Sequence, residues 1–144
     1  MRSGYRFRLV DGFDLEDELT EMHVKAFGKD TPLPDFNVGY WWIVSAFDGE
    51  EAGFCGLRPS YTVPNAGYLI RAAVLEAHRG HGLQKKMVRI REAKARKLGW
   101  TLLRTDTTDN VHSSNNLMNM GYRLFEPAHK WAFDHSLYWT KTLT

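Results

Sequence analysis

A short glycine-containing stretch has the residue types best suited to chemistry in this chain. It reads Val74-Leu75-Glu76-Ala77-His78-Arg79-Gly80-His81-Gly82-Leu83-Gln84-Lys85-Lys86. A predicted strand ends at its start, two glycines follow, and a basic amphipathic helix begins at its end. Unpaired backbone N–H groups and the positive end of a helix dipole therefore gather at one place. Such a place binds anions, so the stretch predicts a site for a phosphorylated ligand.

The two nucleotide-binding loops that glycines most often indicate do not fit this stretch. It lacks the Gly-Lys-Ser/Thr ending with which a P-loop holds the terminal phosphates and Mg²⁺. It also lacks the third glycine of a dinucleotide-binding fingerprint, and residues 97–100 contain no acidic side chain that would bind a ribose. The pattern therefore argues against both kinds of site.

The elements that position this stretch alternate between strands and helices. Aromatic and β-branched runs predict strands at residues 5–10, 39–47, 52–57, 66–75, 100–105, 122–125 and 136–142. Apolar residues at helical spacing predict helices at residues 14–27 (with Asp14 as its N-cap), 83–98 and 110–120. Asp48-Gly49 signals a hairpin turn, and Arg71 interrupts the otherwise apolar strand 66–75. The alternation favours a mixed α/β or α+β sheet.

Helix 83–98 has the clearest amphipathic pattern. Its predicted buried face contains Leu83, Met87, Ile90 and Leu98. The opposite, solvated face is predicted to contain Lys85, Arg89, Glu92 and Arg96.

One motif surrounds Arg79 and Gly82, and a second extends from Asn110 to Gly121-Tyr122. Both resemble motifs of the GNAT family of N-acetyltransferases. The family's acetyl-CoA loop reads Gln/Arg-x-x-Gly-x-Gly/Ala at a strand-to-helix turn; Arg79 and Gly82 match it, whereas Gln84 replaces a second small residue. Downstream, Asn110 and Gly121-Tyr122 have the spacing of the family's next motif, with Ser113 at its small-residue position. The resemblance covers residues 66–125, and the ending 138–141 also looks like the last strand of small bacterial members.

The resemblance implies a GNAT fold in a single domain over residues 1–144. This fold has a central, mixed but largely antiparallel sheet of about six to seven strands, flanked by helices and splayed at the acetyl-CoA site. Acetyl-CoA is the implied co-substrate, and its acetyl group is expected to pass directly to a primary amine of an acceptor that the sequence does not identify. The expected acetyl-CoA-binding residues are Ala73, Val74, Arg79, Gly80, His81, Gly82, Leu83, Gln84, Lys85, Asn110 and Ser113.

Two positions depart from the family and leave the proton-transfer residues unassigned. Strand 66–75 has no carboxylate where many members have a glutamate, and Leu117 stands where many have a tyrosine acid. Asp106 follows a predicted strand near the expected thioester and is a candidate general base. A cap of the following loop is the alternative role for Asp106.

Two further function classes stay open. Without the usual glutamate and tyrosine, the chain could be a non-catalytic sensor or interaction module that binds acetyl-CoA or CoA. The eight basic residues between Arg79 and Lys97 could also bind nucleic acid through helix 83–98, although such a run is more often a solvated helix face. His78 and His81 could tune the phosphate site, although histidines in surface loops are more often inert. The aromatic run 40–47 either lines an acceptor pocket or belongs to the core.

Composition sets the remaining expectations. A chain of 144 residues with 43% hydrophobic content fits one folded domain, and a net charge of +2 does not by itself imply nucleic acid. A single cysteine, Cys55, fits a reducing compartment and a core position, and the histidine spacing predicts no metal site. With no signal-peptide pattern and no apolar run near 20 residues, we expect a soluble cytoplasmic protein without a membrane partner. The aromatic strand 137–142 could pair with a second copy in a homodimer.

Overall fold

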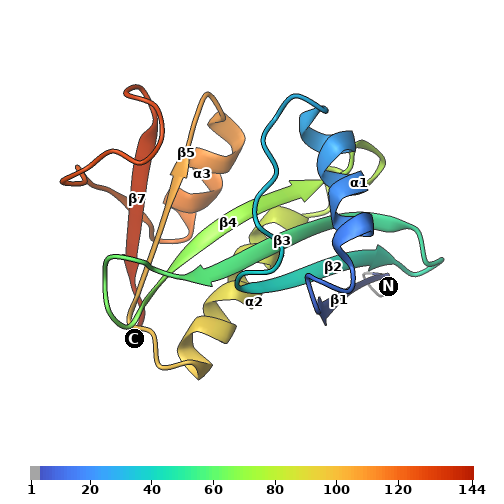
Figure 1. Ribbon diagram of the computed structural model, residues 1–144, viewed down its shortest axis with the longest axis horizontal. Coiled ribbons are helices and arrows are strands. Elements are labelled where there is room, and N and C mark those ends of the chain that lie inside the picture. The colour runs from blue at the N-terminus through green and yellow to red at the C-terminus, as the bar shows by residue number, and fades with distance from the viewer. Residues whose placement is uncertain (1–3) are drawn as a thin grey trace. The chain divides into compact units, whose positions relative to one another are not determined.

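The computed structural model describes residues 4–144, which contain seven strands and three α-helices (Figure 1). In chain order these are β1 (Tyr5–Val10), α1 (Glu16–Phe27), β2 (Tyr40–Ala46), β3 (Glu51–Pro59), β4 (Ala66–Val74), α2 (Leu83–Lys97), β5 (Leu102–Thr107), α3 (Val111–Asn119), β6 (Arg123–Leu124) and β7 (Leu137–Thr142). A short 3₁₀ helix, η1 (Glu76–His78), precedes α2. Met1 to Ser3, part of the predicted domain range, lie outside the described residues.

The seven strands form one sheet in the order β1-β2-β3-β4-β5-β7-β6. Pairing is antiparallel between β1 and β2, β2 and β3, β5 and β7, and β6 and β7, whereas β4 and β5 are parallel. The ladder between β4 and β5 joins only residues 66–68 to residues 102–104, although both strands continue beyond it. The sheet is therefore mixed and largely antiparallel, and this part of the prediction is confirmed.

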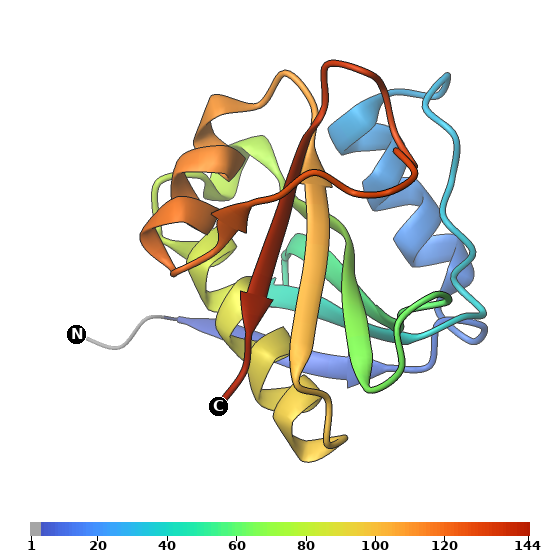
Figure 2. The same cartoon turned by 90° about the vertical axis from the view of Figure 1, so that its left-hand side faces the viewer.

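The C-terminal strand β7 is an inner strand of this sheet. It pairs with β5 over its whole length, as Figure 2 shows, and with the short β6 through Trp139 and Thr140. Trp139 and Thr140 are therefore paired on both sides within the described chain, and pairing of β7 with a second copy stays a prediction.

The chain divides into two compact units, which are described separately. Unit 1 contains the chain up to Arg58 and Ile70–Leu83, and unit 2 contains Pro59–Leu69 and Gln84–Thr144. Unit 1 thus holds β1, α1, β2, nearly all of β3, the second half of β4 and η1. Unit 2 holds the first half of β4, nearly all of α2 and the elements after it.

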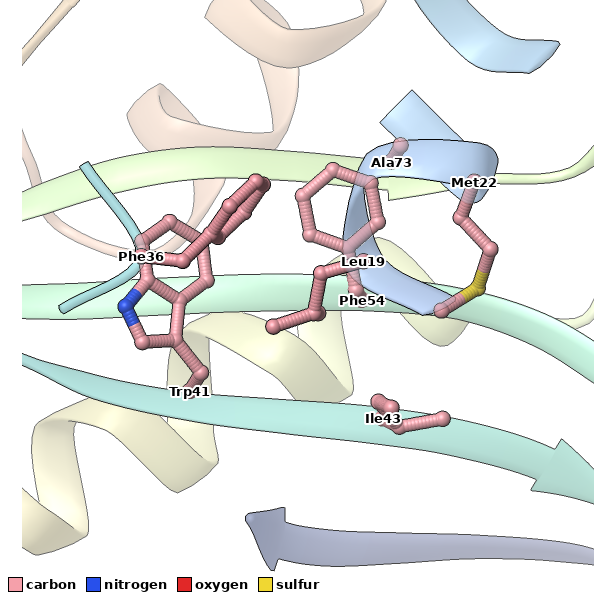
Figure 3. Packing of buried hydrophobic residues seen from close by; sticks show 7 residues of the cluster. All are labelled: Leu19, Met22, Phe36, Trp41, Ile43, Phe54 and Ala73. Carbon is pink, nitrogen blue, oxygen red and sulfur yellow. The ribbon is translucent and has the colours of Figure 1, made fainter. Parts of the chain in front are cut away.

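The core of unit 1 is a hydrophobic cluster to which α1, β2, β3 and β4 contribute (Figure 3). Its members are Leu19, Met22, Phe36, Trp41, Ile43, Phe54 and Ala73. Fully burying a side chain of leucine or phenylalanine size stabilises a fold by about 1.5–3 kcal/mol. Trp42 and Cys55 are also buried, so the two tryptophans of β2 and the cysteine belong to the core, whereas Tyr40 is half-buried. Phe47, just after β2, is instead exposed.

Helix α1 begins later than predicted. Its N-cap position is Leu15, which makes no side-chain capping bond, so the assignment of Asp14 as the cap is wrong. The side chain of Asp11 instead accepts hydrogen bonds from the backbone N–H groups of Phe13 and Asp14 at 2.9 and 3.2 Å. Because this carboxylate organises the turn that precedes the helix, no side-chain cap is needed at Asp14.

Helix α2 buries a different face from the one that its periodicity suggests. Leu83 and Met87 are buried as predicted, but Ile90 and Leu98 are only half-buried, and Glu92 is buried rather than solvated. The burial of Glu92 is explained by its partners in unit 2. Its carboxylate accepts a hydrogen bond from the Tyr122 hydroxyl at 2.8 Å and lies 3.1 Å from Nζ of Lys141.

Helix α3 ends in the way that the Gly121-Tyr122 pair predicts. The N–H of Gly121 donates to the carbonyl of Met118, and the N–H of Tyr122 donates to the carbonyl of Leu117. This is the pattern of a Schellman motif, which satisfies carbonyls at a helix C-terminus. The motif directs the Tyr122 side chain into unit 2, where its hydroxyl reaches Glu92.

Candidate functional site

Residues 79–82 of the glycine stretch form an exposed loop, the glycine loop, between η1 and α2. Gly80, His81 and Gly82 are exposed, and their backbone N–H groups donate no hydrogen bond to any of the described residues 4–144. Leu83, the next residue, begins α2, whose first-turn N–H groups have no intrahelical partner. Several unpaired donors therefore follow one another where the positive end of the helix dipole lies, as an anion site requires.

Both glycines of the loop have backbone conformations that side chains rarely adopt. The φ angles of Gly80 and Gly82 are +84° and +71°. A Cβ atom added at either position would meet no heavy atom within 4 Å, so the space beside the backbone is open. Only strain, and not crowding, therefore opposes a side chain here. An open cradle of this kind fits a phosphate group that approaches the backbone closely.

His78 fixes the start of this loop and is not the inert surface histidine that the sequence suggested. It is buried, with Nε2 2.6 Å from Oε1 of Glu50 and Nδ1 3.1 Å from the Tyr5 hydroxyl. Both partners belong to unit 1, so His78 ties η1 to β1 and to the turn between β2 and β3. His81 is exposed, and its ring centroid lies 5.4 Å from that of Tyr5.

The first turns of α2 carry positive charge that no carboxylate neutralises. The first turn contains no acidic residue, and within the described chain Lys85, Lys86 and Arg89 form no ion pair. These charges strengthen the attraction of the helix N-terminus for an anion. Arg91 is different, because it is buried and its Nε donates to the carbonyl of Met87 at 3.0 Å. It does not contribute to a basic surface stripe of the kind that binds nucleic acid.

Asn110 and Ser113 lie at the N-terminus of α3 in unit 2. Asn110 is the N-cap, and its Oδ1 accepts a hydrogen bond from the backbone N–H of Ser113 at 3.0 Å. Its Nδ2 and the Ser113 hydroxyl make no hydrogen bond to another residue of the described chain. Asn110 therefore has a structural role that the sequence analysis did not assign, and it retains an amide donor for a ligand.

Asp106 lies within β5 rather than after it, and it does not cap a loop. Its Oδ1 accepts hydrogen bonds from the Tyr68 hydroxyl and from Nε1 of Trp131, the latter at 2.9 Å. The Trp131 ring also contacts the ring of Tyr68, with centroids 5.9 Å apart. Both donors reach the same oxygen, so Oδ2 has no hydrogen-bond partner among the residues described. One carboxylate oxygen is held while the other is available.

In unit 1 a buried histidine contacts a half-buried arginine, which the sequence did not predict. Nη1 of Arg71, on β4, lies 2.7 Å from Nε2 of His23, on α1. Burial and, to a smaller extent, the Arg71 charge lower the pKa of His23. The signal available in the sequence was a single arginine within an apolar strand, but its partner lies 48 positions away.

The predicted site residues belong to both units. Ala73, Val74 and the loop from Arg79 to Leu83 lie in unit 1, whereas Gln84, Lys85, Asn110 and Ser113 lie in unit 2. Each set has the local geometry described above. Their convergence on a single ligand stays a prediction. Within residues 4–144, no group of His, Cys, Asp or Glu side chains is arranged to hold a metal ion, and no helix is long and apolar enough to cross a membrane.

Comparison with known families identifies the chain. Residues 12–122 match the acetyltransferase (GNAT) family. This chain belongs to the GNAT acetyltransferase family. The match includes the glycine loop, Asp106, Asn110 and the Gly121-Tyr122 pair. The resemblance inferred from two short motifs is thereby confirmed.

Solved structures show that the chain has the GNAT fold. An acetyltransferase from Bacillus subtilis in complex with CoA has a TM-score of 0.77 and 20% identity, over 97% of this chain and 99% of that one. The ribosomal-protein-S18-alanine N-acetyltransferase from Escherichia coli has a TM-score of 0.75 and 12% identity, over 97% and 94%. The IAA acetyltransferase from Bacillus cereus has a TM-score of 0.75 and 15% identity, over 96% and 99%. No curated protein matches the sequence significantly.

Proposed function

We propose that this chain is an N-acetyltransferase that moves the acetyl group of acetyl-CoA directly to a primary amine, and that residues 1–144 act as one GNAT domain. The proposal is carried by the exposed and unbonded amides from Gly80 to Gly82, which directly precede the basic start of α2. Membership of the GNAT family and the CoA complex of the Bacillus subtilis neighbour support the same ligand.

The glycine loop is the proposed pyrophosphate site. Backbone N–H groups from Gly80 to Gln84 would bind the phosphate oxygens, and the open space beside Gly80 and Gly82 admits them. The N–H of Arg79 already donates to the carbonyl of Glu76, so Arg79 would contribute through its side chain. Lys85, with Lys86 and Arg89, would attract the outer phosphate as separate positive charges. Because no acidic residue occupies the first turn of α2, the helix dipole and these charges act in the same direction.

The pantetheine arm is proposed to extend along β4. The ladder between β4 and β5 stops at Tyr68, so residues 72–74 have no β5 partner in the described chain, and their edge can pair with an extended ligand. The Asn110 Nδ2 group and the Ser113 hydroxyl are proposed to donate hydrogen bonds to carbonyls of the same arm. Acetyl-CoA supplies an acetyl group on a thioester.

Acetyl transfer forms a C–N bond and breaks the C–S bond of the thioester. The acceptor amine attacks only when it is neutral, so a base or a water chain must remove a proton from it. Asp106 is the proposed base, because its Oδ2 is available while Oδ1 is held by Tyr68 and Trp131. The leaving thiolate takes up a proton from a donor that stays unassigned, because the family's tyrosine position is occupied by the buried Leu117.

Calorimetry tests whether acetyl-CoA binds, and an assay of thiol release tests whether its acetyl group is transferred. We expect acetyl-CoA to bind with a dissociation constant well below about 1 mM. A constant of about 1 mM corresponds to a binding free energy of about −4 kcal/mol, so the expected value is more favourable. A panel of primary amines should then release CoA thiol above the rate seen without an amine. The absence of acetyl-CoA binding at about 1 mM would reject the proposal.

A CoA-binding sensor is the second candidate function. It is favoured by the absence of a carboxylate from β4 and by the apolar Leu117 at the position where many members have a tyrosine acid. The two candidates differ in a single measurement. Acetyl-CoA binding without amine-dependent thiol release would favour the sensor, whereas any amine-dependent release above background would exclude a purely binding role.

A further inference from the structure

Arg71 is a half-buried positive charge with no negative partner. It is the only charged residue of β4, and it forms no ion pair with any residue of the described chain. Its Nη1 donates to Nε2 of His23 at 2.7 Å, and its guanidinium carbon lies 5.5 Å from the centroid of the Phe27 ring. These contacts hold the guanidinium in place without neutralising it.

The neighbour that holds Arg71 is itself uncharged. His23 is completely buried, and its pKa is lowered by burial first and by the charge of Arg71 second. Because Nε2 accepts the hydrogen bond from Arg71, the proton of the neutral ring is on Nδ1, which has no partner in the described chain. The pair therefore has a net charge of +1.

A partly buried guanidinium without a counter-ion is unfavourable unless a ligand supplies one. Removing a cation from water costs free energy that is normally recovered from a carboxylate or from additional hydrogen bonds. The planar guanidinium has five N–H donors in a geometry that matches an oxyanion, and His23 accepts only from Nη1. Arg71 thus retains donors and charge for an anionic group.

We propose that Arg71 binds a carboxylate of the acceptor, so that the acceptor is an amine that also carries a carboxylate, as amino acids do. This inference rests on the proposed acetyltransferase function, in which residues 72–74 of β4 bind the arm of acetyl-CoA. Arg71 immediately precedes that segment, and its contact Phe27 ends α1. A carboxylate matches the single charge of Arg71 better than the dianion of a phosphate monoester does.

Matched acceptors test the assignment. For each of several amino acids, the free acid, the carboxamide and the decarboxylated amine are compared by thiol release with saturating acetyl-CoA. The wild-type protein should prefer the acid to the carboxamide at least about 10-fold in kcat/KM, because the carboxamide leaves the guanidinium unpaired. Arg71→Gln should remove this preference by raising KM for the acid, with little change for the carboxamide.

Two variants control for charge and folding. Arg123→Gln removes the same charge from an exposed position in β6 and should keep the wild-type preference. Arg71→Lys keeps the charge without the bidentate geometry, so it should keep part of the preference, and it serves as the second variant if Arg71→Gln does not fold.

Several outcomes would overturn the inference. Equal rates for acid and carboxamide in the wild-type protein would reject it, as would an Arg71→Gln variant that slows both acceptors equally, which indicates a structural role. A preference for phosphoethanolamine over every amino acid would show that the acceptor group bound by Arg71 is a phosphate and not a carboxylate. If acetyl-CoA binds while no carboxylate is preferred, only this inference fails; if acetyl-CoA does not bind, the proposed function fails with it.

Discussion

Nζ of Lys141 lies 3.1 Å from Oε2 of Glu92, and both side chains are largely buried in unit 2. Lys141 also donates to the carbonyl of Met120 at 2.8 Å, and Glu92 accepts a hydrogen bond from Tyr122. This buried ion pair therefore connects β7, α2 and the C-terminal end of α3. Because Lys141 neutralises it, the Glu92 side chain of the otherwise basic helix α2 can be buried.

Removing one member of this pair should destabilise the protein strongly. Lys141→Met leaves the buried Glu92 carboxylate with only the partly exposed Arg96, 3.9 Å away, as a counter-ion, so we expect the free energy of unfolding to fall by about 3 kcal/mol. Chemical denaturation measures the loss. The double variant Glu92→Met/Lys141→Met should recover much of it, because no unpaired charge remains.

A surface ion pair provides the control for this prediction. Lys130 and Glu126 are 3.8 Å apart, with side chains 40% and 84% exposed. Lys130→Met should change stability by less than about 1 kcal/mol, because solvent already screens that pair. Losses of similar size for Lys130→Met and Lys141→Met would contradict the assigned role of burial.

Gly82→Glu should abolish acetyl-CoA binding. The substitution places a negative charge beside the proposed pyrophosphate site and adds a side chain at a φ of +71°. Gly99→Glu is the matched control, because Gly99 also has a positive φ and open space around it. Gly99 follows the C-terminal end of α2, whereas Gly82 precedes its N-terminal end, and the helix between them is about 22 Å long. Calorimetry should show loss of binding for Gly82→Glu alone; unchanged affinity would reject the loop assignment.

Asp106→Asn should separate catalysis from structure. The asparagine carbonyl can still accept the hydrogen bonds from Tyr68 and Trp131, whereas the group at the Oδ2 position can no longer take up a proton. If Asp106 is the general base, kcat should fall by about 10²-fold or more. Acetyl-CoA affinity and thermal stability should change little. Full activity in this variant would exclude Asp106 as the base.

His23 should make the stability of the protein depend on pH. Its folded-state pKa is lowered from the ordinary value of 6.5, so the unfolded chain binds a proton at a higher pH than the native protein does. The free energy of unfolding should therefore be greatest above pH 6.5 and decrease as the pH falls below it. The contribution of this one group cannot exceed about 1.4 kcal/mol per pH unit.

The variant His23→Phe tests this dependence. Denaturation at pH 7.5 and 5.5 should show a smaller decrease in stability for His23→Phe than for the wild-type protein, whatever the absolute stability of the variant. His112→Phe, which removes an exposed imidazole from α3, should keep the wild-type decrease. An identical decrease in all three proteins would show that His23 does not contribute.

The elements that local signals specify were predicted well. The strand at Tyr5–Val10 and the start of α2 at Leu83 are found at the predicted residues. Alternation, helical spacing and turn glycines act over a few residues, so they can be recognised in a single sequence. The cap of α1 was misassigned because Asp11 and Asp14 have the same side chain and only the folded turn selects between them.

The roles of the charged and polar residues depended on distant partners. Glu92 was placed on the solvated face of α2, yet its partners are 30 and 49 positions away. His78 looked like a loop histidine, but Tyr5 is 73 positions from it. No periodicity within one helix or loop indicates such contacts.

By itself, the sequence determined the family, the glycine loop and the basic helix that follows it, because these are short motifs of backbone geometry and charge. Only the tertiary structure decided which charges are buried and what they contact. Arg71 illustrates the difference: the sequence shows an arginine in an apolar strand, and the fold pairs it with a neutral histidine and leaves its charge for a ligand. Burial and pairing depend on contacts between segments that are far apart in the chain, and local sequence patterns do not specify those contacts.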